Sequence, residues 1–466
     1  MPMHIKLKTL GGLLWHYVVP THNIMPLRGG SPMTTIPQVA RAMRETLTTT
    51  ADEAARATRF VQRTSPLGGA TFSQTLVFGF LGNPQATLEE LAQTAATLGV
   101  SITPQALDQR FTAAAAACLE QVLTAAISRV IAAEPVAIPL LARFPAVYLQ
   151  DSSTIVLPDA LAGVWQGCGG STPAHTSAAL KLQVRLELRT GCLAGLQLQD
   201  GRASDRSAAA PDLPAGALRI ADLGYWSVEA LQALHQQGSF WLSRLQSQTA
   251  VYDPVGHRQD LLELLATQPT ETVELPILLG EGHRLPARLF AVPVPSDVAA
   301  TRRQRLRAAA HKKGRQVSAR CLALAAWTLL VTNLSPARLT LREALVLGRV
   351  RWQIELLFKL WKSHGHVDES RSTKPWRILC EVYAKLLAML LQHWLLLVSC
   401  WAYPNRSLTK AAQTIQKHAL HLASAFATVR RLCTAILTVK RCLAAGCRMN
   451  RRKKRPNTYQ LLLEMT

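Results

Sequence analysis

Apolar positions recur at helical spacing over residues 35–135, a region rich in Ala, Leu, Gln and Thr. The capping box Thr87-Leu-Glu-Glu90 predicts the start of a helix over Leu88–Leu98. Gly99 ends that helix, and Thr103-Pro104 provides an N-cap and a first-turn proline for the next one. The pattern therefore predicts two short helices joined by a glycine-containing turn.

Such a helix pair has two interpretations. As a helix-turn-helix it would aim Gln105, Gln109 and Arg110 outward at DNA. As an ordinary helical hairpin it would have only a packing role. The sequence leaves both open, because short helix pairs are common in helical domains.

From residue 147 onward the apolar spacing becomes that of strands. Five runs fit this pattern: Val147–Leu157, Leu180–Leu188, Cys192–Leu198, Leu218–Asp222 and Phe240–Leu245. Gly191 provides a hairpin turn, and a helix is expected over Val228–Gln236. Three strands in a meander, a helix, a strand and a helix follow the order of an RNase H-like core. We therefore predict an α/β fold with a mixed sheet flanked by helices.

The rest of the chain divides by composition. We expect a poorly ordered or wrongly assigned start at 1–34 and a helical N-terminal domain at 35–140. The core would occupy 141–248 and 339–403, with a catalytic helix in its second part, and a basic helical region would follow at 404–466. Between the two parts of the core, short proline-containing strands predict a mainly β, basic insertion at 249–338.

The charge balance indicates an anionic partner. The 466 residues contain 52 Lys and Arg against 29 Asp and Glu, a net charge of +23, although only 17% of residues are charged. Hydrophobic residues make up 48%, which excludes a disordered chain. A folded protein with this excess of positive charge is expected to bind nucleic acid.

Two segments concentrate this charge, 302–320 and 440–455, with eight bases each. The first contains no acid, which favours phosphate contact over a merely solvated face. The candidates for phosphate contact are Arg302, Arg303, Arg305, Lys312 and Lys313.

Nothing in the sequence favours zinc, secretion or a membrane. The nine cysteines form no C-x-x-C pair, which indicates reduced thiols in a cytosolic protein. No cleavage site follows the weak apolar patch within residues 1–20. The uncharged stretch Leu386–Asn405 contains Gln392, His393 and Ser399, so we interpret it as a buried helix and expect no membrane association.

Two aspartates occupy positions where strands disfavour them. Asp151 interrupts an apolar strand and Asp222 ends another, and a small or turn-forming stretch follows each at once. Each carboxylate would then face the crevice at a strand end, where ligands of open sheets bind. The alternative for either residue alone is a helix or turn cap.

A third carboxylate lies on a helix with two bases. Arg351, Glu355 and Lys362 share one helical stripe. A surface Arg–Glu pair would contribute only about 0.2–0.5 kcal/mol and would not explain the apolar residues around it. Beside the two aspartates, Glu355 would complete a set of three carboxylates that can hold two Mg²⁺ ions about 3.5–4 Å apart, with Mn²⁺ able to substitute.

These residues match a known signature. It reads Y-x-x-R-x-x-x-E followed by six residues and K, and the stripe from Arg351 to Lys362 fits three of its four positions. With Gln150-Asp151-Ser-Ser-Thr and Ala221-Asp222-Leu-Gly-Tyr225, the sequence resembles the cut-and-paste insertion-sequence transposases of the IS-four group, which have an RNase H-like DDE core.

The resemblance implies an enzyme and a set of roles. Asp151, Asp222 and Glu355 would hold the metal, while Arg351 and Lys362 would grip phosphates. The substrate would be double-stranded DNA, both the terminal inverted repeats of the element and target DNA. Release through a hairpin intermediate and action as a DNA-bridged homodimer are also implied. Such an enzyme would work on the nucleoid in a bacterial cytoplasm.

One position departs from the signature, because Gly348 stands where the family has its tyrosine. Two alternatives therefore remain: a metal-dependent nuclease on the same core, and a DNA-binding remnant with impaired catalysis. Trp327 is similarly open. It is either a core tryptophan beside a strand or, as the resemblance implies, a platform for an extruded base.

Overall fold

The computed structural model describes residues 34–63, 65–169, 177–205, 212–267, 272–311, 314–403, 405–450 and 456–465. Nearly all of the expected start at 1–34 falls outside these ranges. So do Lys312 and Lys313 and the bases at 451–455.

A mixed sheet forms the centre of the fold, and its strands in the described ranges run in the order β3-β2-β1-β4-β5-β10-β9-β8-β6-β7. The first five strands are β1 (Val147–Leu157), β2 (Ala178–Glu187), β3 (Leu193–Asp200), β4 (Leu218–Ala221) and β5 (Phe240–Arg244). β1, β2 and β3 are antiparallel neighbours, whereas β1, β4 and β5 run parallel. The predicted α/β fold with a mixed sheet is therefore confirmed, and helix α8 (Val228–Gln236) connects β4 to β5 as expected.

Residues 249–338 extend this sheet. They supply β6 (Val251–Tyr252), β7 (Arg258–Gln259), β8 (Val273–Leu279), β9 (Leu285–Pro293) and β10 (Trp327–Thr332). They also supply helices α9 (Leu261–Ala266), α10 (Ser296–His311) and α11 (Ala319–Leu324). The segment is mixed rather than mainly β, because the basic run begins with Ala, Arg, Gln and Leu, which are strong helix formers.

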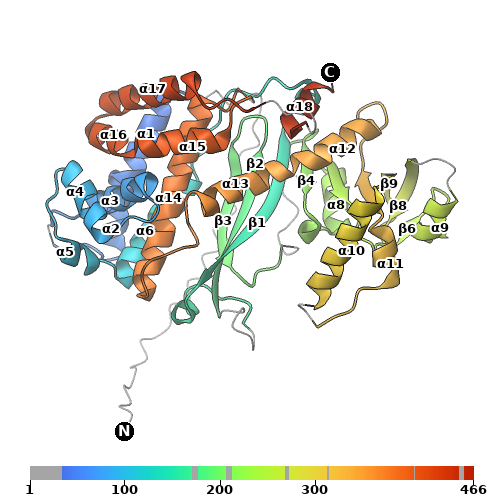
Figure 1. Cartoon of the computed structure of the whole chain (residues 1–466), viewed down its shortest axis with the longest axis horizontal. Helices are drawn as coiled ribbons and strands as arrows, with labels where there is room; N and C mark the ends of the chain where they lie inside the picture. Colours follow the sequence, from blue (N-terminus) through green and yellow to red (C-terminus); the bar gives the residue numbers. More distant parts are fainter. Residues whose placement is uncertain are drawn as a thin grey trace, which may run out of the picture. The chain divides into compact units, whose positions relative to one another are not determined.

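The helical regions at the two ends of the chain share one core. The N-terminal helices are α1 (Ile36–Leu47), α2 (Thr49–Ala57), α3 (Gly69–Gly82), α4 (Leu88–Thr97), α5 (Pro104–Asp108) and α6 (Ala113–Ile127). A short helix, α7 (Pro139–Ala142), precedes β1. The C-terminal helices are α14 (Pro375–Ser399), α15 (Leu408–Lys417), α16 (Ala419–Ser424), α17 (Val429–Ala445) and α18 (Thr458–Leu463). α14 packs against α3 and α6, and α17 packs against α1 (Figure 1).

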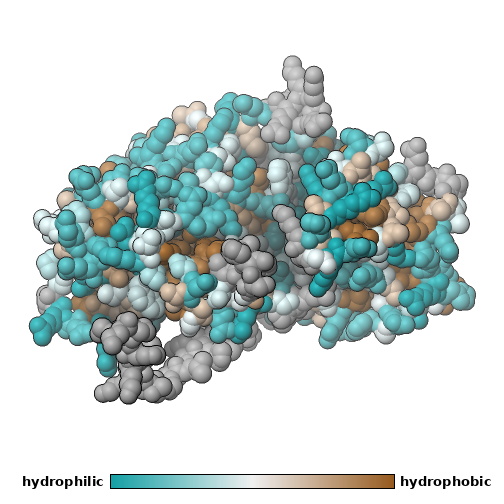
Figure 2. Space-filling view, turned by 60° about the horizontal axis from the view of Figure 1, so that its bottom comes forward, coloured by the Kyte–Doolittle hydropathy of each residue, from teal (hydrophilic) through white to brown (hydrophobic). Residues whose placement is uncertain are grey.

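Among the described helices, α14 alone is long and apolar enough to cross a membrane, but 94% of its apolar window is buried within the fold. It is therefore built as a core helix, as predicted. Figure 2 shows apolar side chains on one face as patches among hydrophilic ones.

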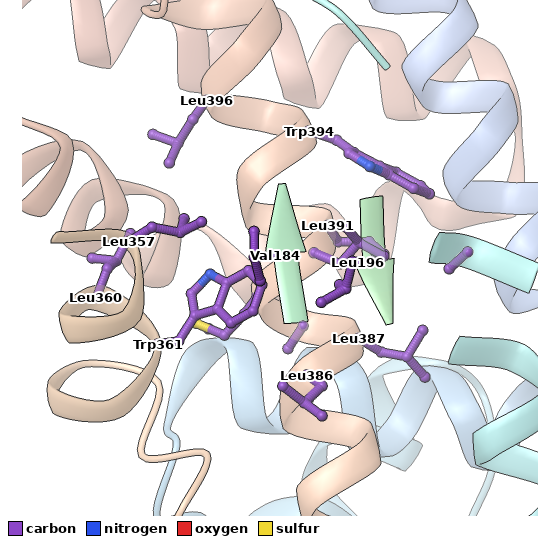
Figure 3. Packing of buried hydrophobic residues seen from close by; sticks show 14 of the residues in the cluster. Val184, Leu196, Leu357, Leu360, Trp361, Leu386, Leu387, Leu391, Trp394 and Leu396 are labelled. Atoms are coloured by element: carbon purple, nitrogen blue, oxygen red, sulfur yellow. The ribbon is translucent and has the colours of Figure 1, made fainter. Parts of the chain in front are cut away.

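The expected catalytic helix consists of two helices in one line across the sheet, α12 (Leu341–Val350) and α13 (Trp352–Ser363) (Figure 1). Apolar side chains on α13 belong to the main core. Trp361 points from α13 toward Val184 of β2, and Leu391 of α14 lies next to Leu196 of β3 (Figure 3). Because one face of α13 is buried in this core, the side chains on its other faces, including Glu355, are held in fixed positions relative to the sheet.

Candidate active site

The parallel pairing of β1 and β4 aligns the two aspartates. Gln150 lies opposite Ala221 in the register, so Asp151, the next residue of β1, is close to Asp222, which follows the end of β4. The expectation that Asp151 lies at a strand end is wrong, because β1 continues to Leu157. The Asp151 carboxylate accepts a hydrogen bond from the backbone N–H of Ser152 at 2.8 Å. Asp222 precedes a short 3₁₀ helix but makes no side-chain capping bond to it. Its carboxylate is therefore not committed to a cap.

Arg351 connects all three carboxylates. Its Nη1 lies 3.3 Å from Asp151 Oδ2 and 3.9 Å from Asp222 Oδ1, and its Nη2 donates to Glu355 Oε1. Only 22% of the arginine side chain is exposed. The Arg351–Glu355 pair is therefore part of a larger cluster, and the surface-pair interpretation is wrong.

The break between α12 and α13 falls on Arg351. Its backbone keeps helical angles, with φ at −47° and ψ at −33°. The predicted stripe therefore continues through the break, and Glu355 stays one turn beyond Arg351 on the face that meets β1.

The electrostatics of Asp151 follow from its surroundings. Burial raises the pKa of Asp151, the Ser152 N–H and the Arg351 guanidinium lower it, and the charges of Asp222 and Glu355 raise it. Together these effects raise the pKa of Asp151 to about 6. The ionised cluster therefore needs a positive charge among its carboxylates, and Arg351 supplies one.

The donor set fits a divalent cation. Carboxylate oxygens are ligands that hard divalent cations take from proteins. As arranged, no group of three or more His, Cys, Asp or Glu in the described ranges could hold a metal ion. The guanidinium lies among the three carboxylates, so binding of a metal there requires the Arg351 side chain to move.

Lys362 lies on the same stripe but has other partners. Its Nζ donates to the Thr154 carbonyl of β1 at 2.7 Å and lies 3.9 Å from Asp368 Oδ2. Lys362 is therefore placed along β1 beyond Asp151 and is not paired with the three carboxylates.

A polar network next to Asp151 joins Tyr225 of the matched motif to side chains that the sequence analysis does not name as candidates. The Tyr225 hydroxyl bonds to Gln183 Oε1, and Gln183 Nε2 donates to Asp205 Oδ1 at 2.9 Å. Burial raises the pKa of Tyr225, and the Ser152 side chain hydrogen-bonds it. Tyr225 belongs to the matched motif, whereas its buried partner on β2, Gln183, can be identified only from the pairing of the strands in the structure.

The three candidate DNA-contacting residues of the helix pair near residue 100 differ in their exposure. Gln105 and Gln109 are exposed. The outward orientation expected for Arg110 is wrong: its guanidinium stacks 4.4 Å from the Phe60 ring centroid and donates to the Leu67 carbonyl at 3.3 Å. Helix α5 has only five residues, which leaves little of a recognition helix.

The candidate phosphate-binding residues of the basic run also differ in their surroundings. Arg302 donates to the Trp327 carbonyl at 2.9 Å, and Arg303 donates to the Leu322 carbonyl at 2.9 Å. Both side chains therefore stabilise the fold, whereas Arg305 is exposed. Trp327 is half-buried and packs against the second hydrophobic cluster, as a core tryptophan would. Lys312 and Lys313 lie outside the described residues.

Comparison with known proteins agrees with this geometry. Residues 142–391 match the family described as the transposase DDE domain. The chain is 27% identical to the transposase for insertion sequence element IS231F of Bacillus thuringiensis subsp. israelensis, over 73% of this chain and 76% of that protein. It is 25% identical to the transposase for insertion sequence element IS1151 of Clostridium perfringens, over 72% and 76% of the two chains.

Proposed function

Because the chain belongs to the family of insertion-sequence transposases with a DDE domain, enzymes that cut DNA and transfer its strands, we propose that Asp151, Asp222 and Glu355 carry this chemistry. The observation that supports the assignment is the convergence of these three carboxylates on one guanidinium. The residues come from three separate parts of the chain: Asp151 lies within β1, Asp222 follows the end of β4, and Glu355 lies on α13.

These carboxylates would hold the divalent cations, two Mg²⁺ ions or Mn²⁺ in their place. When bound, such ions activate water and stabilise the leaving oxygen of a phosphodiester. The protein contributes the positions of the ligands. β1 and β4 fix the two aspartates, and the buried face of α13 orients Glu355 toward them.

We assign Arg351 two successive tasks. In the metal-free protein it neutralises the carboxylates, and on substrate binding it would turn to a phosphate. Lys362 would bind a second phosphate from its position along β1, where its present partners are a backbone carbonyl and a partly exposed aspartate. Charge and position support both assignments: each side chain is positively charged and partly exposed, so DNA can reach it.

The wider reaction follows from the family. We propose that the enzyme binds the terminal inverted repeats of its element and acts as a homodimer on that DNA. It would release the donor through a hairpin intermediate and join the element to target DNA, in a bacterial cytoplasm at the nucleoid.

Neutralising each carboxylate tests the assignment. Asp151→Asn, Asp222→Asn and Glu355→Gln should each abolish Mg²⁺-dependent cleavage of element-end DNA while binding of that DNA is retained. Double variants should be no worse than single ones, because a site that lacks any ligand already fails. Glu229→Gln, at an exposed position on α8, is the matched control and should cleave normally. Full cleavage by any one of the three variants would remove that residue from the site.

The products separate this enzyme from a nuclease on the same core. A transposase yields DNA in which the element end is joined to a target strand, whereas a nuclease stops at hydrolysis. Incubation with labelled element ends and plasmid target, followed by denaturing electrophoresis, distinguishes the two outcomes.

A further inference from the structure

A groove of about 1000 Å³ lies alongside α12 and α13. Its other walls come from the end of α14, from Tyr403 and residues 406–410, and from residues 449–450 and 456–462. Arg351 and Glu355 also line it, so the groove opens directly onto the candidate active site. The three carboxylates and their metal do not account for this volume.

The groove is strongly cationic. Five bases line it, whereas Glu355 is the one acid among its described lining residues. Lys410 donates to the Arg448 carbonyl at 3.1 Å. Arg349 and Lys359 are exposed, and their side chains have no recorded hydrogen bond or ion pair within the described part of the chain. They lie ten residues apart, about 15 Å along the α12–α13 line. Because both line the groove, one extended ligand can contact both.

Exposed aromatic rings complete the groove. Trp352 on α13 is 55% exposed, and Tyr403, which follows α14, is 56% exposed. Rings flanked by unpaired cations are the combination with which proteins bind single-stranded nucleic acid, because bases stack on the rings and phosphates pair with the cations.

We propose that this groove binds an unpaired DNA strand that leaves the active site, with a base stacked on Tyr403 and phosphates held by Arg349 and Lys359. This inference rests on the proposed function, since it assigns the path of the DNA next to Glu355. An unpaired strand is favoured over a duplex because a duplex keeps its bases stacked inside and cannot offer their faces to Tyr403. The continuity of the groove with the active site indicates the same strand that is cut there.

The test measures DNA affinity in the Asp151→Asn background with EDTA present, so that no metal-dependent cleavage complicates binding even if Asp151 is not a metal ligand. Two labelled probes are compared by fluorescence anisotropy, a blunt element-end duplex and the same duplex with an unpaired extension on the cut strand. The extension should strengthen binding by about tenfold, and Tyr403→Ala should remove most of that gain, because stacking on an aromatic ring contributes about this much per base. Blunt-duplex affinity should stay unchanged.

The cations are tested through salt dependence. Arg349→Gln with Lys359→Gln should lower the salt slope for the extended probe by about 1.4, at about 0.7 per single-strand phosphate. Arg430→Gln with Arg431→Gln removes the same charge from exposed positions on α17 and should leave the difference between the two probes intact.

Three results would overturn the proposal: no gain from the extension, equal losses on both probes in the groove variants, or equal effects from the α17 control pair. All variants should retain the thermal unfolding midpoint of the parent, since the substituted side chains are exposed. Because binding is measured without catalysis, failure of the carboxylate assignment would leave these affinities unaltered, so the two failures are distinguishable.

Discussion

The glycine at position 348 allows a specific prediction about the later steps of transposition. Gly348 lies in α12 and lines the same groove as Arg351 and Glu355. A Cβ built there would meet the two δ-carbons of Leu330 at 3.5 and 3.7 Å, which are ordinary van der Waals distances. The backbone therefore accepts a Cβ without a forced shift, and the groove lies beside it, so Gly348→Tyr is a feasible way to restore the tyrosine of the family signature.

The size of the effect follows from one hydrogen bond. A tyrosine hydroxyl near the carboxylates could donate to a phosphate of the cut strand, a charged acceptor, which contributes about 1.5–3 kcal/mol. That corresponds to roughly one to two decades in rate if the bond forms only in the transition state. Glycine in a helix also costs about 0.5–1 kcal/mol relative to alanine, so the variant should be at least as stable as the parent.

Metal-dependent nicking should not need this hydrogen bond, whereas the step that holds a bent strand end should. We therefore expect the native protein to nick element ends and to accumulate unjoined intermediate. Gly348→Tyr should speed the later step at least several-fold with nicking unchanged. Time courses with end-labelled DNA, resolved on denaturing gels, give the two rates separately.

Gly348→Phe is the matched control, because it adds the same ring without the hydroxyl. If Phe accelerates the later step as much as Tyr, the effect comes from filling the groove or from the helix, and the hydrogen-bond argument fails. If the native protein already completes excision and Tyr is no faster, position 348 has no such role. The interpretation of the chain as a catalytically impaired remnant then loses its main support.

Three further predictions concern stability and charge. Burial lowers the pKa of the His393 imidazole from 6.5 in the unfolded chain to about 4 in the fold. The neutral imidazole therefore stabilises the fold above pH 6.5, and this part of the unfolding free energy is lost as the pH falls from 6.5 toward 4. When the pH is lowered from about 8 to about 5, the unfolding free energy measured in urea should fall by about 2 kcal/mol more in the parent than in His393→Gln. Equal decreases in the two proteins would refute this. Replacing the exposed Arg305 and Arg307 by Gln should lower the salt slope of duplex binding by up to about 1.8, whereas Arg302→Gln should instead lower the thermal midpoint. Arg110→Ala should cost about 1–2 kcal/mol in unfolding free energy with DNA affinity unchanged; weaker DNA binding by a fully stable variant would restore its outward role.

The sequence predicted those elements whose signals are local. β1 and α8 begin and end where the pattern placed them, because alternation, caps and turn residues all lie within a few positions of each boundary. The proximity of Asp151 and Asp222 also followed from local pattern. Asp222 comes directly after β4 and Asp151 interrupts the apolar pattern within β1, and the parallel pairing of these strands brings the two together.

Contacts between distant segments could not be predicted in this way. The sequence offered Glu355 as the partner of Arg351, four residues away, whereas the second partner, Asp151, is 200 residues distant. Arg110 was expected to face solvent because an arginine on a short helix usually does, but Phe60 and Leu67 provide a ring and a carbonyl for it. In each case the guanidinium finds partners that only the tertiary fold brings near.

The helical ends of the chain also act on the active site, although none of the three candidate carboxylates lies in them. The turn after α13 is fastened to α14: Lys385 donates to the carbonyls of His366 at 3.1 Å and Glu369 at 2.6 Å. Gly365 approaches α14 so closely that a Cβ there would lie 2.4 Å from the Met389 sulfur. Because α14 is the helix on which the N-terminal helices α3 and α6 pack, the end of α13 is held by the helical regions while its beginning meets β1. The orientation of Glu355 toward the aspartates therefore depends on both attachments, and a disturbance of the α14 packing would reach the candidate site through α13.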